Sequence, residues 1–343
     1  MPVRNEGAFI RQSLRAVLDQ DYPRDLIEVL VTDGMSTDET RKTINEFQAN
    51  DYRIKLIDNP GKIVPTGLNA ALKLATGEII VRVDGHCEIA PDYVRRCVAH
   101  LESSDIDAVG GPLETVGESQ MAEAIAMAMS STFGVGGSAF RTVKTESMLT
   151  DTVAFPAYKR SVIEKAGLFD EELVRNQDDE YNYRLRKLGA RILLAVDVNC
   201  RYFSRSSLRK LFKQYFQYGY WKVRVFQKHP GQMQLRHFVP VAFVLSLMSL
   251  LLASLFFWPA RLLFGLALML YAFANILASM LTVRNGKWHH VFRLPVIFAT
   301  LHVSYGFGFI VGLARFAPRW FTRREQSLPF VLTQIPGDHS EVL

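Results

Sequence analysis

Hydrophobic positions in the first half of the chain follow two alternating periods. Short β-branched runs at residues 27–31 and 53–57 predict buried strands, whereas apolar residues three or four positions apart at 8–20 and 39–49 predict helices. Pro23 follows the first of these helices, where it would end it. Strands and helices that alternate at this length predict an α/β fold with a mostly parallel sheet and helices on both faces.

The same alternation extends to residue 196. The Gly-rich segment 134–138 lies within it and lacks the Gly-Lys-Ser/Thr of a phosphate-binding P-loop, so we expect a structural turn there. We expect residues 192–196 to form the last strand of the domain. Further helices are predicted at 68–75, 92–102 and 121–131 and, from the basic pair Lys159 and Arg160, within 155–169; further strands are predicted at 78–83 and 108–111.

Residues 1–6 have the polar character of a loop that follows a strand, yet no strand precedes them. Two explanations are open: the sheet lacks its first strand, or the sequence starts inside a longer coding region. We favour the second explanation, under which the first strand is truncated.

Uncharged stretches dominate the chain after residue 237. Residues 238–258 and 262–283 are each about as long as a bilayer core is thick, and they predict two membrane helices. Only residues 259–261 connect them, which predicts a tight hairpin. A third uncharged stretch, residues 294–314, has the same length but contains a proline and three glycines.

The third stretch conflicts with the distribution of positive charge. If the first domain is cytoplasmic, a third crossing would place the Arg-rich tail outside, against the positive-inside rule. A crossing helix, a re-entrant segment and an interfacial helix all remain open, and uncharged length favours the crossing.

The segment between the α/β part and the membrane helices is basic, aromatic and amphipathic. Residues 208–228 therefore predict an interfacial helix. The organisation we expect is an α/β domain at 1–207, an amphipathic linker at 208–237, a membrane region of two to three helices at 238–316, and a basic then polar tail at 317–343.

The net charge of +6 comes from basic residues beside the apolar stretches. This distribution suits the anionic cytoplasmic face of a membrane. The first half has no basic block interleaved with aromatic residues, which argues against nucleic acid as a partner. The three cysteines, Cys87, Cys97 and Cys200, lack metal-ligand spacing and predict buried, reduced thiols in a cytoplasmic domain.

Candidate chemistry lies in two acidic segments. Asp84 and His86 follow a predicted strand, at the edge where open α/β sheets bind ligands. A carboxylate and an imidazole with few other protein ligands suit Mn²⁺ or Mg²⁺ held jointly with the phosphates of a nucleotide diphosphate. Asp33 ends another strand at the same edge, where it could bind a nucleobase or simply cap the following helix.

The second acidic segment is Asp178, Asp179 and Glu180 at the start of a predicted helix. Mutual repulsion should raise the pKa of at least one of these carboxylates, which would suit a general base. An acidic helix N-terminus stabilised by the helix dipole explains the same pattern. The residues alone leave these two interpretations equal.

Five motifs in order resemble the family 2 glycosyltransferases with the GT-A fold. The segment at residues 2–6 resembles their nucleotide-binding loop, Asp33 stands at the base-binding aspartate, and Asp84-Gly85-His86 stands at the metal-binding Asp-x-Asp motif. Residues 167–171 resemble the hallmark before the acceptor site, and Gln177 with Asp178 stands at the Glu-Asp pair that contains the catalytic base. The resemblance implies that Pro2, Arg4, Asn5, Glu6, Asp33 and Asp84 bind the nucleotide-sugar, that Asp84 and His86 bind the metal, that Asp178 is the base, and that Asp179, Glu180, Gln217 and Trp221 lie on the acceptor side.

The chain departs from the family pattern at several of these positions. His86 replaces the last aspartate of the metal motif, Gly34 replaces the second aspartate of a pair, and Gln177 replaces a glutamate. Tyr220 stands where processive synthases have arginine, which favours single additions over polymer synthesis.

The tail at residues 302–308 resembles that of membrane-bound exopolysaccharide enzymes of the succinoglycan type. This resemblance implies an inverting, metal-dependent transfer of a hexose from a UDP-sugar to a lipid-linked or polysaccharide acceptor. The expected location is the cytoplasmic face of a bacterial inner membrane, with a multi-pass anchor. The alternatives are a nucleotidyltransferase and a catalytically inactive membrane scaffold.

Overall fold

The computed structural model describes residues 1–143, 145–283 and 287–320. A first sheet has the order β1 (Pro2–Val3), β2 (Val29–Asp33) and β3 (Ile54–Asp58), and all its strands are parallel. Pro2 and Val3 pair with Thr32 and Asp33, so two residues do occupy the edge position where the sequence predicted no strand. The first strand is therefore short but present.

Two further sheets complete the α/β part. Both contain parallel and antiparallel strands, whereas the alternating pattern predicted a mostly parallel sheet. The second sheet runs β4 (Ile79–Val81), β9 (Ala154–Lys159), β6 (Ala108–Gly111), β10 (Ile192–Leu194) and β8 (Met148–Leu149), with β9 antiparallel to both of its neighbours. The third runs β5 (Cys87–Ile89), β11 (Cys200–Phe203) and β7 (Leu113–Val116), with β5 antiparallel to β11.

Strands β9 and β11 correct two predictions. The sequence predicted a helix within 155–169, but the helix starts only at Arg160 and the preceding residues form β9. Pro156 lowers the strand signal of β9, and it is tolerated because the register against β6 shifts between Val109 and Gly111. Strand β11 follows the segment that was expected to be the last strand.

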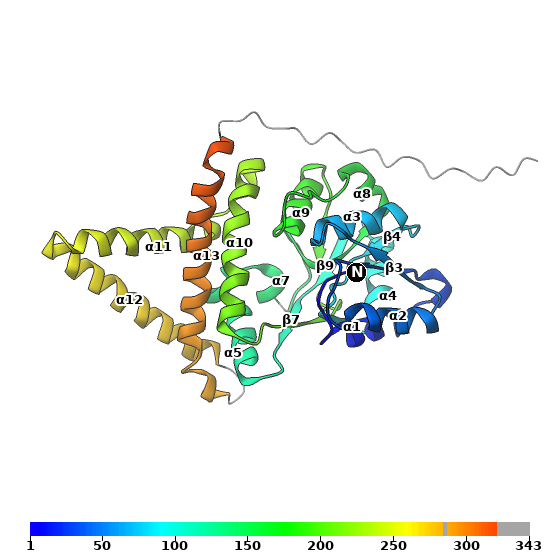
Figure 1. Cartoon of the computed structure of the whole chain (residues 1–343), viewed down its shortest axis with the longest axis horizontal. Helices are drawn as coiled ribbons and strands as arrows, with labels where there is room; N and C mark the ends of the chain where they lie inside the picture. Colours follow the sequence, from blue (N-terminus) through cyan, green and yellow to red (C-terminus); the bar gives the residue numbers. More distant parts are fainter. Residues whose placement is uncertain (144, 284–286, 321–343) are drawn as a thin grey trace, which may run out of the picture.

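Helices cover the sheets and join them to the membrane region (Figure 1). Those of the α/β part largely match the predicted helices. They are α1 (Ile10–Leu18), α2 (Thr40–Asn50), α3 (Val64–Leu74), α4 (Tyr93–Ser103), α5 (Gln120–Met129), α8 (Arg160–Ala166) and α9 (Gln177–Lys187), with short helices α6 (Thr132–Val135) and α7 (Ala139–Thr142) and a 3-10 turn at Arg24–Leu26. The predicted turn at 134–138 is confirmed, because Gly136 and Gly137 both have positive φ.

Four long helices follow: α10 (Leu208–Lys228), α11 (Leu235–Ser254), α12 (Trp258–Thr282) and α13 (Leu294–Phe316), with 3-10 turns at Pro230–Gln232, Trp288–His290 and Ala317–Trp320. Figure 1 shows α11 and α12 projecting as a hairpin, with α10 and α13 side by side between the hairpin and the α/β part. The segments containing α11, α12 and α13 are long and apolar enough to cross a membrane.

Helix α13 differs from the projecting hairpin because its surroundings are largely protein. About 44% of its most apolar window is buried, against 11% for α11 and for α12. Its first turns, including Leu294 and Phe298, join the core that also contains Ile125 and Met129 of α5. The part of the predicted tail beyond residue 320 lies outside the described residues.

Helices α10 and α13 approach each other through glycines. A Cβ on Gly219 of α10 would lie 2.0 Å from the carbonyl oxygen of Tyr305, and one on Gly308 of α13 would lie 2.1 Å from that of Phe216. The helix predicted to lie at the membrane interface is thus covered along one side by α13. This contact ties the membrane region to the helix that borders the candidate site. The domain boundaries drawn from the sequence stay predictions.

Candidate active site

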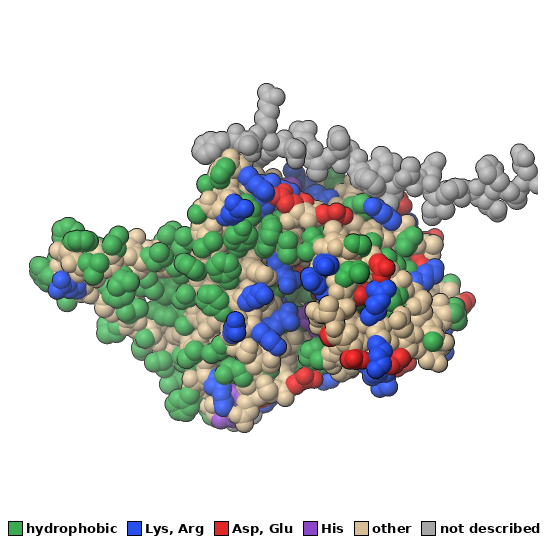
Figure 2. Space-filling view, viewed as in Figure 1, with side chains coloured by type: hydrophobic (Ala, Val, Ile, Leu, Met, Phe, Trp, Pro, Cys, Tyr) green, Lys and Arg blue, Asp and Glu red, His purple; other side chains and the backbone are tan. Residues whose placement is uncertain are grey.

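A cavity of about 1180 Å³ separates the α/β part from the long helices. Asp84, His86 and Asp178 line it on one side, and Pro240 and Tyr271 line it from α11 and α12. Figure 2 shows hydrophobic side chains covering the hairpin and Lys and Arg side chains gathered between the hairpin and the α/β part. One cavity therefore borders both the predicted catalytic residues and the apolar helices α11 and α12.

Arg82 connects the two acidic segments. Its Nε lies 3.0 Å from Asp84 Oδ1 and its Nη2 lies 3.2 Å from Asp84 Oδ2, while Nη1 lies 3.8 Å from Asp178 Oδ2. The guanidinium is largely buried. Burial by itself would raise the pKa of Asp84, but the charges of Arg82 and His86 outweigh it and the pKa is lowered. Asp84 is thus held as a carboxylate.

His86 sits beside Asp84 in a defined orientation. Its Nδ1 lies 2.9 Å from Glu6 Oε1, and its ring meets the edge of the Tyr202 ring at a centroid distance of 5.1 Å. The other ring nitrogen, Nε2, has no hydrogen-bond partner among the described residues, and a partner at one nitrogen that leaves the other open is the usual arrangement of histidines that bind metals. Asp84 and His86 therefore offer the carboxylate and imidazole donors that suit Mn²⁺.

The three acids at the start of α9 have separate surroundings. Asp179 pairs with Lys222 of α10, and Glu180 is bonded to Arg184 Nε at 2.7 Å and His229 Nε2 at 3.0 Å. Burial by itself would raise the pKa of Asp179 and of Glu180, but these partners outweigh it and lower both values. The expected rise is therefore not found at these two carboxylates. The Asp178 side chain is 45% exposed and lines the cavity. Its cationic partner is Arg82 at 3.8 Å, a looser contact than those of Asp179 and Glu180.

The predicted nucleotide-binding segments lie together but outside the cavity lining. Asn5 Oδ1 accepts a hydrogen bond from the backbone N–H of Thr37 at 2.9 Å, and the backbone N–H of Asn5 donates to Ser36 Oγ at 2.9 Å. Asp33 is fully buried and pairs with Arg41 Nη1 at 3.1 Å. The Glu6 amide donates to Thr40 Oγ1, and the Arg4 guanidinium donates to the Lys62 carbonyl. Pro2 lies in β1.

The remaining predicted residues separate into two groups. Gln177 and Gln217 line the cavity, and Gln177 Oε1 is buried without a hydrogen-bond partner among the described residues. Gln217 Oε1 accepts a bond from Arg175 Nε at 3.2 Å. Trp221 does not line the cavity; its ring packs on Phe316 at a centroid distance of 5.8 Å.

Most of the cations that line the cavity were not predicted from the sequence. Eight Lys and Arg residues line it against three Asp residues, an excess of five positive charges. Five of these cations have no carboxylate within ion-pair distance in the part of the chain that the structure describes. These five are Arg141, Arg175, Arg205, Lys210 and Lys213. The basic pattern of α10 indicates Lys210 and Lys213, whereas no local sequence pattern marks the three arginines as site residues.

One group of three potential metal ligands lies elsewhere. Glu123, His289 and His290 offer ligand atoms within 4.8 Å of one another, and Lys287 also pairs with Glu123. The described residues near Asp84 form no such group of three. A cation at Asp84 and His86 would thus take further ligands from a substrate. Cys87, Cys97 and Cys200 are buried free thiols, as predicted.

Comparison with known proteins identifies the class. The sequence matches the family described as Glycosyl transferase family 2 over residues 1–167. The succinoglycan biosynthesis protein ExoA of Rhizobium meliloti is 31% identical over 71% of this chain and 73% of that protein. The chain therefore belongs to the family 2 glycosyltransferases and is an enzyme of that type.

A second relative covers nearly the whole chain. The dolichyl N-acetyl-alpha-D-glucosaminyl phosphate 3-beta-D-2,3-diacetamido-2,3-dideoxy-beta-D-glucuronosyltransferase of Methanococcus voltae is 27% identical over 92% of this chain and 96% of that protein. Together with ExoA, it relates this chain to enzymes named for glycan assembly.

Solved structures confirm the GT-A-type fold. The mannosyltransferase PcManGT of Pyrobaculum calidifontis, in complex with GDP-Man and Mn²⁺, matches with a TM-score of 0.57 at 20% identity, over 89% of this chain and 85% of that one. Staphylococcus aureus TarS 1-349 with UDP-GlcNAc matches with a TM-score of 0.51 at 17% identity, over 92% of this chain and 90% of that one.

Proposed function

We propose that this enzyme is an inverting, metal-dependent transferase that moves a hexose from a UDP-sugar to a lipid-linked acceptor at a membrane surface. The observation that carries the proposal is that Asp84 and Asp178, joined by one guanidinium, line a cavity that membrane helices also line. Asp84 supplies a metal ligand on the diphosphate side and Asp178 supplies a base. The apolar helices give a lipid-linked acceptor access to both.

Asp178 is the proposed base. It removes the proton of the acceptor hydroxyl as that oxygen attacks the anomeric carbon from the face opposite the departing diphosphate, so the configuration inverts. Asp179 also lines the cavity but pairs with Lys222, and Glu180 is bonded to Arg184 and His229. Asp178, whose nearest cation is Arg82 at 3.8 Å, is therefore the carboxylate of α9 that is most available to a substrate. Asp179 and Glu180 then serve to fix the start of α9.

The donor diphosphate belongs beside Asp84 and His86. These residues fit a divalent ion such as Mn²⁺, which would neutralise the diphosphate as the glycosidic bond breaks. The structural neighbour PcManGT holds Mn²⁺ with GDP-Man, which supports a metal here. Glu6 orients His86, and Arg82 keeps Asp84 ionised.

The nucleoside belongs at the edge formed by residues 2–6 and Asp33. Bonds between Asn5 and residues 36–37 join these two segments into one surface. Asp33 is covered by Arg41 in this structure, so a nucleobase that binds it has to displace that guanidinium. TarS with UDP-GlcNAc supports a uridine donor by its fold.

The cysteines and the charges support a cytoplasmic orientation in the inner membrane. The three buried thiols suit a reducing compartment, and the basic residues near α10 suit an anionic membrane surface. We therefore place the α/β part on the cytoplasmic side and α11 and α12 in the bilayer.

Replacing Asp178 by Asn tests the function. In membranes supplied with labelled UDP-hexose, we expect transfer to fall at least about a hundredfold, since a general base typically contributes that much. Asp105→Asn is the matched control, because Asp105 is exposed and pairs only with Arg191 on the surface. Transfer by Asp178→Asn within a few-fold of the parent would contradict the base assignment, and a parent that released no UDP from any UDP-hexose would contradict the function.

A further inference from the structure

Helix α13 is apolar enough to cross a membrane, yet it is oriented differently from the hairpin of α11 and α12. Figure 1 shows α11 and α12 pointing away from the α/β part, whereas α13 runs alongside α10 across the base of the hairpin. With 23 residues, α13 is about 35 Å long, so its two ends are about as far apart as the two faces of a bilayer core. The attachment of each end therefore decides whether this helix crosses.

The beginning of α13 is bonded to the α/β part. Just before the helix, His290 Nε2 lies 2.9 Å from Glu123 Oε2 of α5, and Lys287 pairs with the same carboxylate. Arg293 Nη2 donates to Gln120 Oε1 of α5 at 2.8 Å. His290 is fully buried, so these contacts belong to a packed interface. The first end of α13 thus lies on the side of the membrane that holds α5.

The other end of α13 is bonded to the same part of the molecule. The Phe316 carbonyl accepts a hydrogen bond from Gln227 Nε2 of α10 at 2.9 Å. Just beyond the helix, Arg319 pairs with Glu172, which lies between α8 and α9. Arg224 of α10 binds the same carboxylate through its Nε at 2.7 Å. The second end of α13 thus lies on the side of the membrane that holds α8 and α9.

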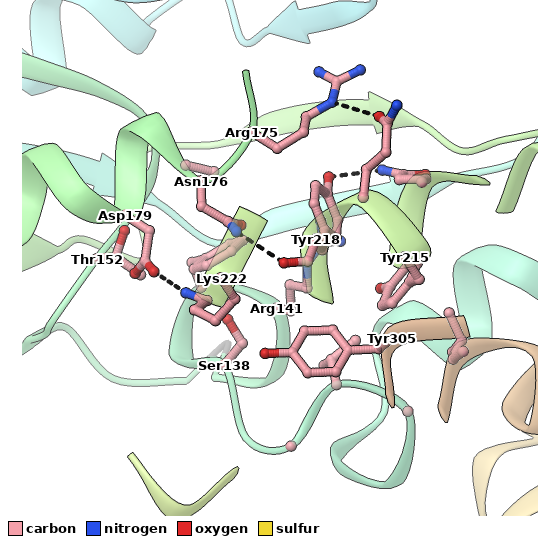
Figure 3. Close-up of a pocket in the computed structure, with 18 of the residues that line it drawn as sticks. Ser138, Arg141, Thr152, Arg175, Asn176, Asp179, Tyr215, Tyr218, Lys222 and Tyr305 are labelled. Atoms are coloured by element: carbon pink, nitrogen blue, oxygen red, sulfur yellow. Dashed lines mark hydrogen bonds and ion pairs between the residues drawn. The ribbon is translucent and has the colours of Figure 1, made fainter. Parts of the chain in front are cut away.

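The middle of α13 is also turned toward protein. His302 Nε2 lies 2.8 Å from the carbonyl oxygen of Phe133 in α6. Tyr305 lines the cavity, and Figure 3 shows its ring reaching toward Ser138 and Lys222. Along its whole length, α13 therefore contacts the part of the molecule that lies outside the bilayer core.

The exposed face of α13 is apolar. Val296, Val303 and Phe307 are exposed, and spacings of seven and four residues place them on one side of the helix as an apolar stripe. Exposed tryptophans, Trp288 and Trp320, flank the helix at its two ends, and tryptophan is enriched at membrane–water interfaces. Such a stripe suits the boundary between lipid headgroups and acyl chains.

A helix that crossed the bilayer would place Glu123 and Glu172 on opposite faces of it, yet both belong to the α/β part. We propose that α13 does not cross the bilayer and instead lies along its surface beside α10, with the apolar stripe against lipid. Among the described residues, only α11 and α12 then cross. The inference takes from the proposed function only that α11 and α12 lie in the bilayer.

This arrangement removes the conflict with the distribution of positive charge. Lys287 and Arg293 before α13, and Arg315 and Arg319 after its middle, all share the side of the α/β part. Arg261, at the turn between α11 and α12, lies on the far side. An anchor with two crossings therefore satisfies the positive-inside rule, which a third crossing would break.

Cysteine labelling in membrane vesicles tests this topology. Single cysteines replace four exposed residues: Asp105 in the α/β part, Phe256 at the hairpin turn, Phe292 before α13 and Ala317 after it. The parent is the background control, because its three cysteines are buried. We expect a membrane-impermeant maleimide to label Asp105→Cys, Phe292→Cys and Ala317→Cys from one side of the membrane. Phe256→Cys should be labelled only from the other side.

The outcomes separate this inference from the proposed function. Labelling of Phe292→Cys and Ala317→Cys from opposite sides would overturn the surface position of α13. Labelling of Phe256→Cys from the same side as Asp105→Cys would instead overturn the crossing of the hairpin, which belongs to the proposed function.

A depth measurement gives an answer even if lipid shields an end of α13 from the label. A nitroxide on Val303→Cys, near the middle of α13, is compared in nanodiscs with one on Leu245→Cys, near the middle of α11, since both positions are exposed. Collision with oxygen and with a water-soluble nickel complex reports the depth of each nitroxide. We expect position 303 to lie within about 5–10 Å of the headgroup boundary and position 245 near the bilayer centre, about 15 Å from it. Equal depths would overturn the inference.

Discussion

Arg82 Nη1 lies 3.8 Å from Asp178 Oδ2, although the two residues come from different elements far apart in the chain. The same guanidinium holds both oxygens of Asp84 at 3.0 and 3.2 Å. One buried cation therefore sets the spacing between the carboxylate assigned to the diphosphate side and the carboxylate assigned to the base. Arg82 is a positioning residue in this arrangement, since it acts through Asp84 and Asp178.

We expect Arg82→Gln to shift the pH dependence of transfer. Arg82 keeps the pKa of Asp84 low against the effect of burial, so its loss raises that pKa. Asp84 then ionises only at higher pH, and the acid limb of the pH–rate profile for UDP release moves upward in pH. A buried carboxylate without its partner should also cost about 3–5 kcal/mol of stability.

Arg11→Gln is the control for this prediction. Arg11 pairs with Glu46 at 2.6 Å on the surface, where both side chains are about half exposed. Its loss should change stability by less than about 0.5 kcal/mol and leave the pH profile in place. An acid limb that coincides for Arg82→Gln and the parent would show that Arg82 has no role in the ionisation of Asp84.

Chelation and a change at His86 test the metal assignment. We expect EDTA to abolish transfer and Mn²⁺ to restore it better than Mg²⁺, because imidazole suits Mn²⁺ and Mg²⁺ prefers oxygen ligands. His86→Asp should raise the ratio of the Mg²⁺-supported rate to the Mn²⁺-supported rate several-fold. His100→Asn is the control, since His100 bonds Asp197 away from the cavity and should leave the ratio unchanged. A ratio that His86→Asp does not alter argues against His86 as a ligand.

Glu180 provides a prediction about stability and pH. It is buried with Arg184 and His229, which lower its pKa despite burial. A carboxylate whose pKa is lowered in the folded state stabilises the protein above its unfolded pKa, about 4.3 for glutamate, and this stabilisation disappears as pH falls through the lower folded value. Glu180→Gln should cost about 3 kcal/mol at pH 7 and lose less stability than the parent on acidification.

Thermal unfolding in detergent at pH 7 and pH 4 measures this difference. Glu39→Gln is the control, because Glu39 forms an exposed pair with Lys42 at 3.1 Å and should be nearly neutral at both values. Equal stability of Glu180→Gln and the parent at pH 7 would mean that Glu180 makes no net contribution to folding.

Local patterns predicted the elements that local interactions determine. The apolar helices α11 and α12 were expected at 238–258 and 262–283 and lie at Leu235–Ser254 and Trp258–Thr282, because uncharged length is itself the signal. Strand β2 was expected at 27–31 and ends at Asp33, so the candidate residue is the last residue of the strand. Motif order placed Asp84, His86 and Asp178 in one site, and the structure brings all three to one cavity.

Contacts between distant segments could not be predicted in this way. Arg82 and Asp84 are two residues apart, so their contact is local. The approach of Arg82 to Asp178 depends instead on the tertiary fold, which pairs β9 with β4 and brings the start of α9 close to Arg82. Tyr305 was part of a recognised tail pattern, yet only the packing of α13 on α10 brings its hydroxyl into the cavity. Trp221 was expected on the acceptor side and faces away, because α10 turns its Lys222 side toward Asp179.

The close contact between α10 and α13 gives the last prediction. A Cβ on Gly219 would lie 2.0 Å from the Tyr305 carbonyl oxygen and 2.9 Å from the Phe309 amide nitrogen, and neither backbone atom can move without separating the helices. Gly219→Ala should therefore lower stability by about 1–3 kcal/mol. Gly265→Ala in α12 is the matched control, since its Cβ meets nothing within 4 Å and alanine is the better helix former. Thermal unfolding of the two variants in the same detergent measures the difference, and equal midpoints would mean that the helices are not held at this distance.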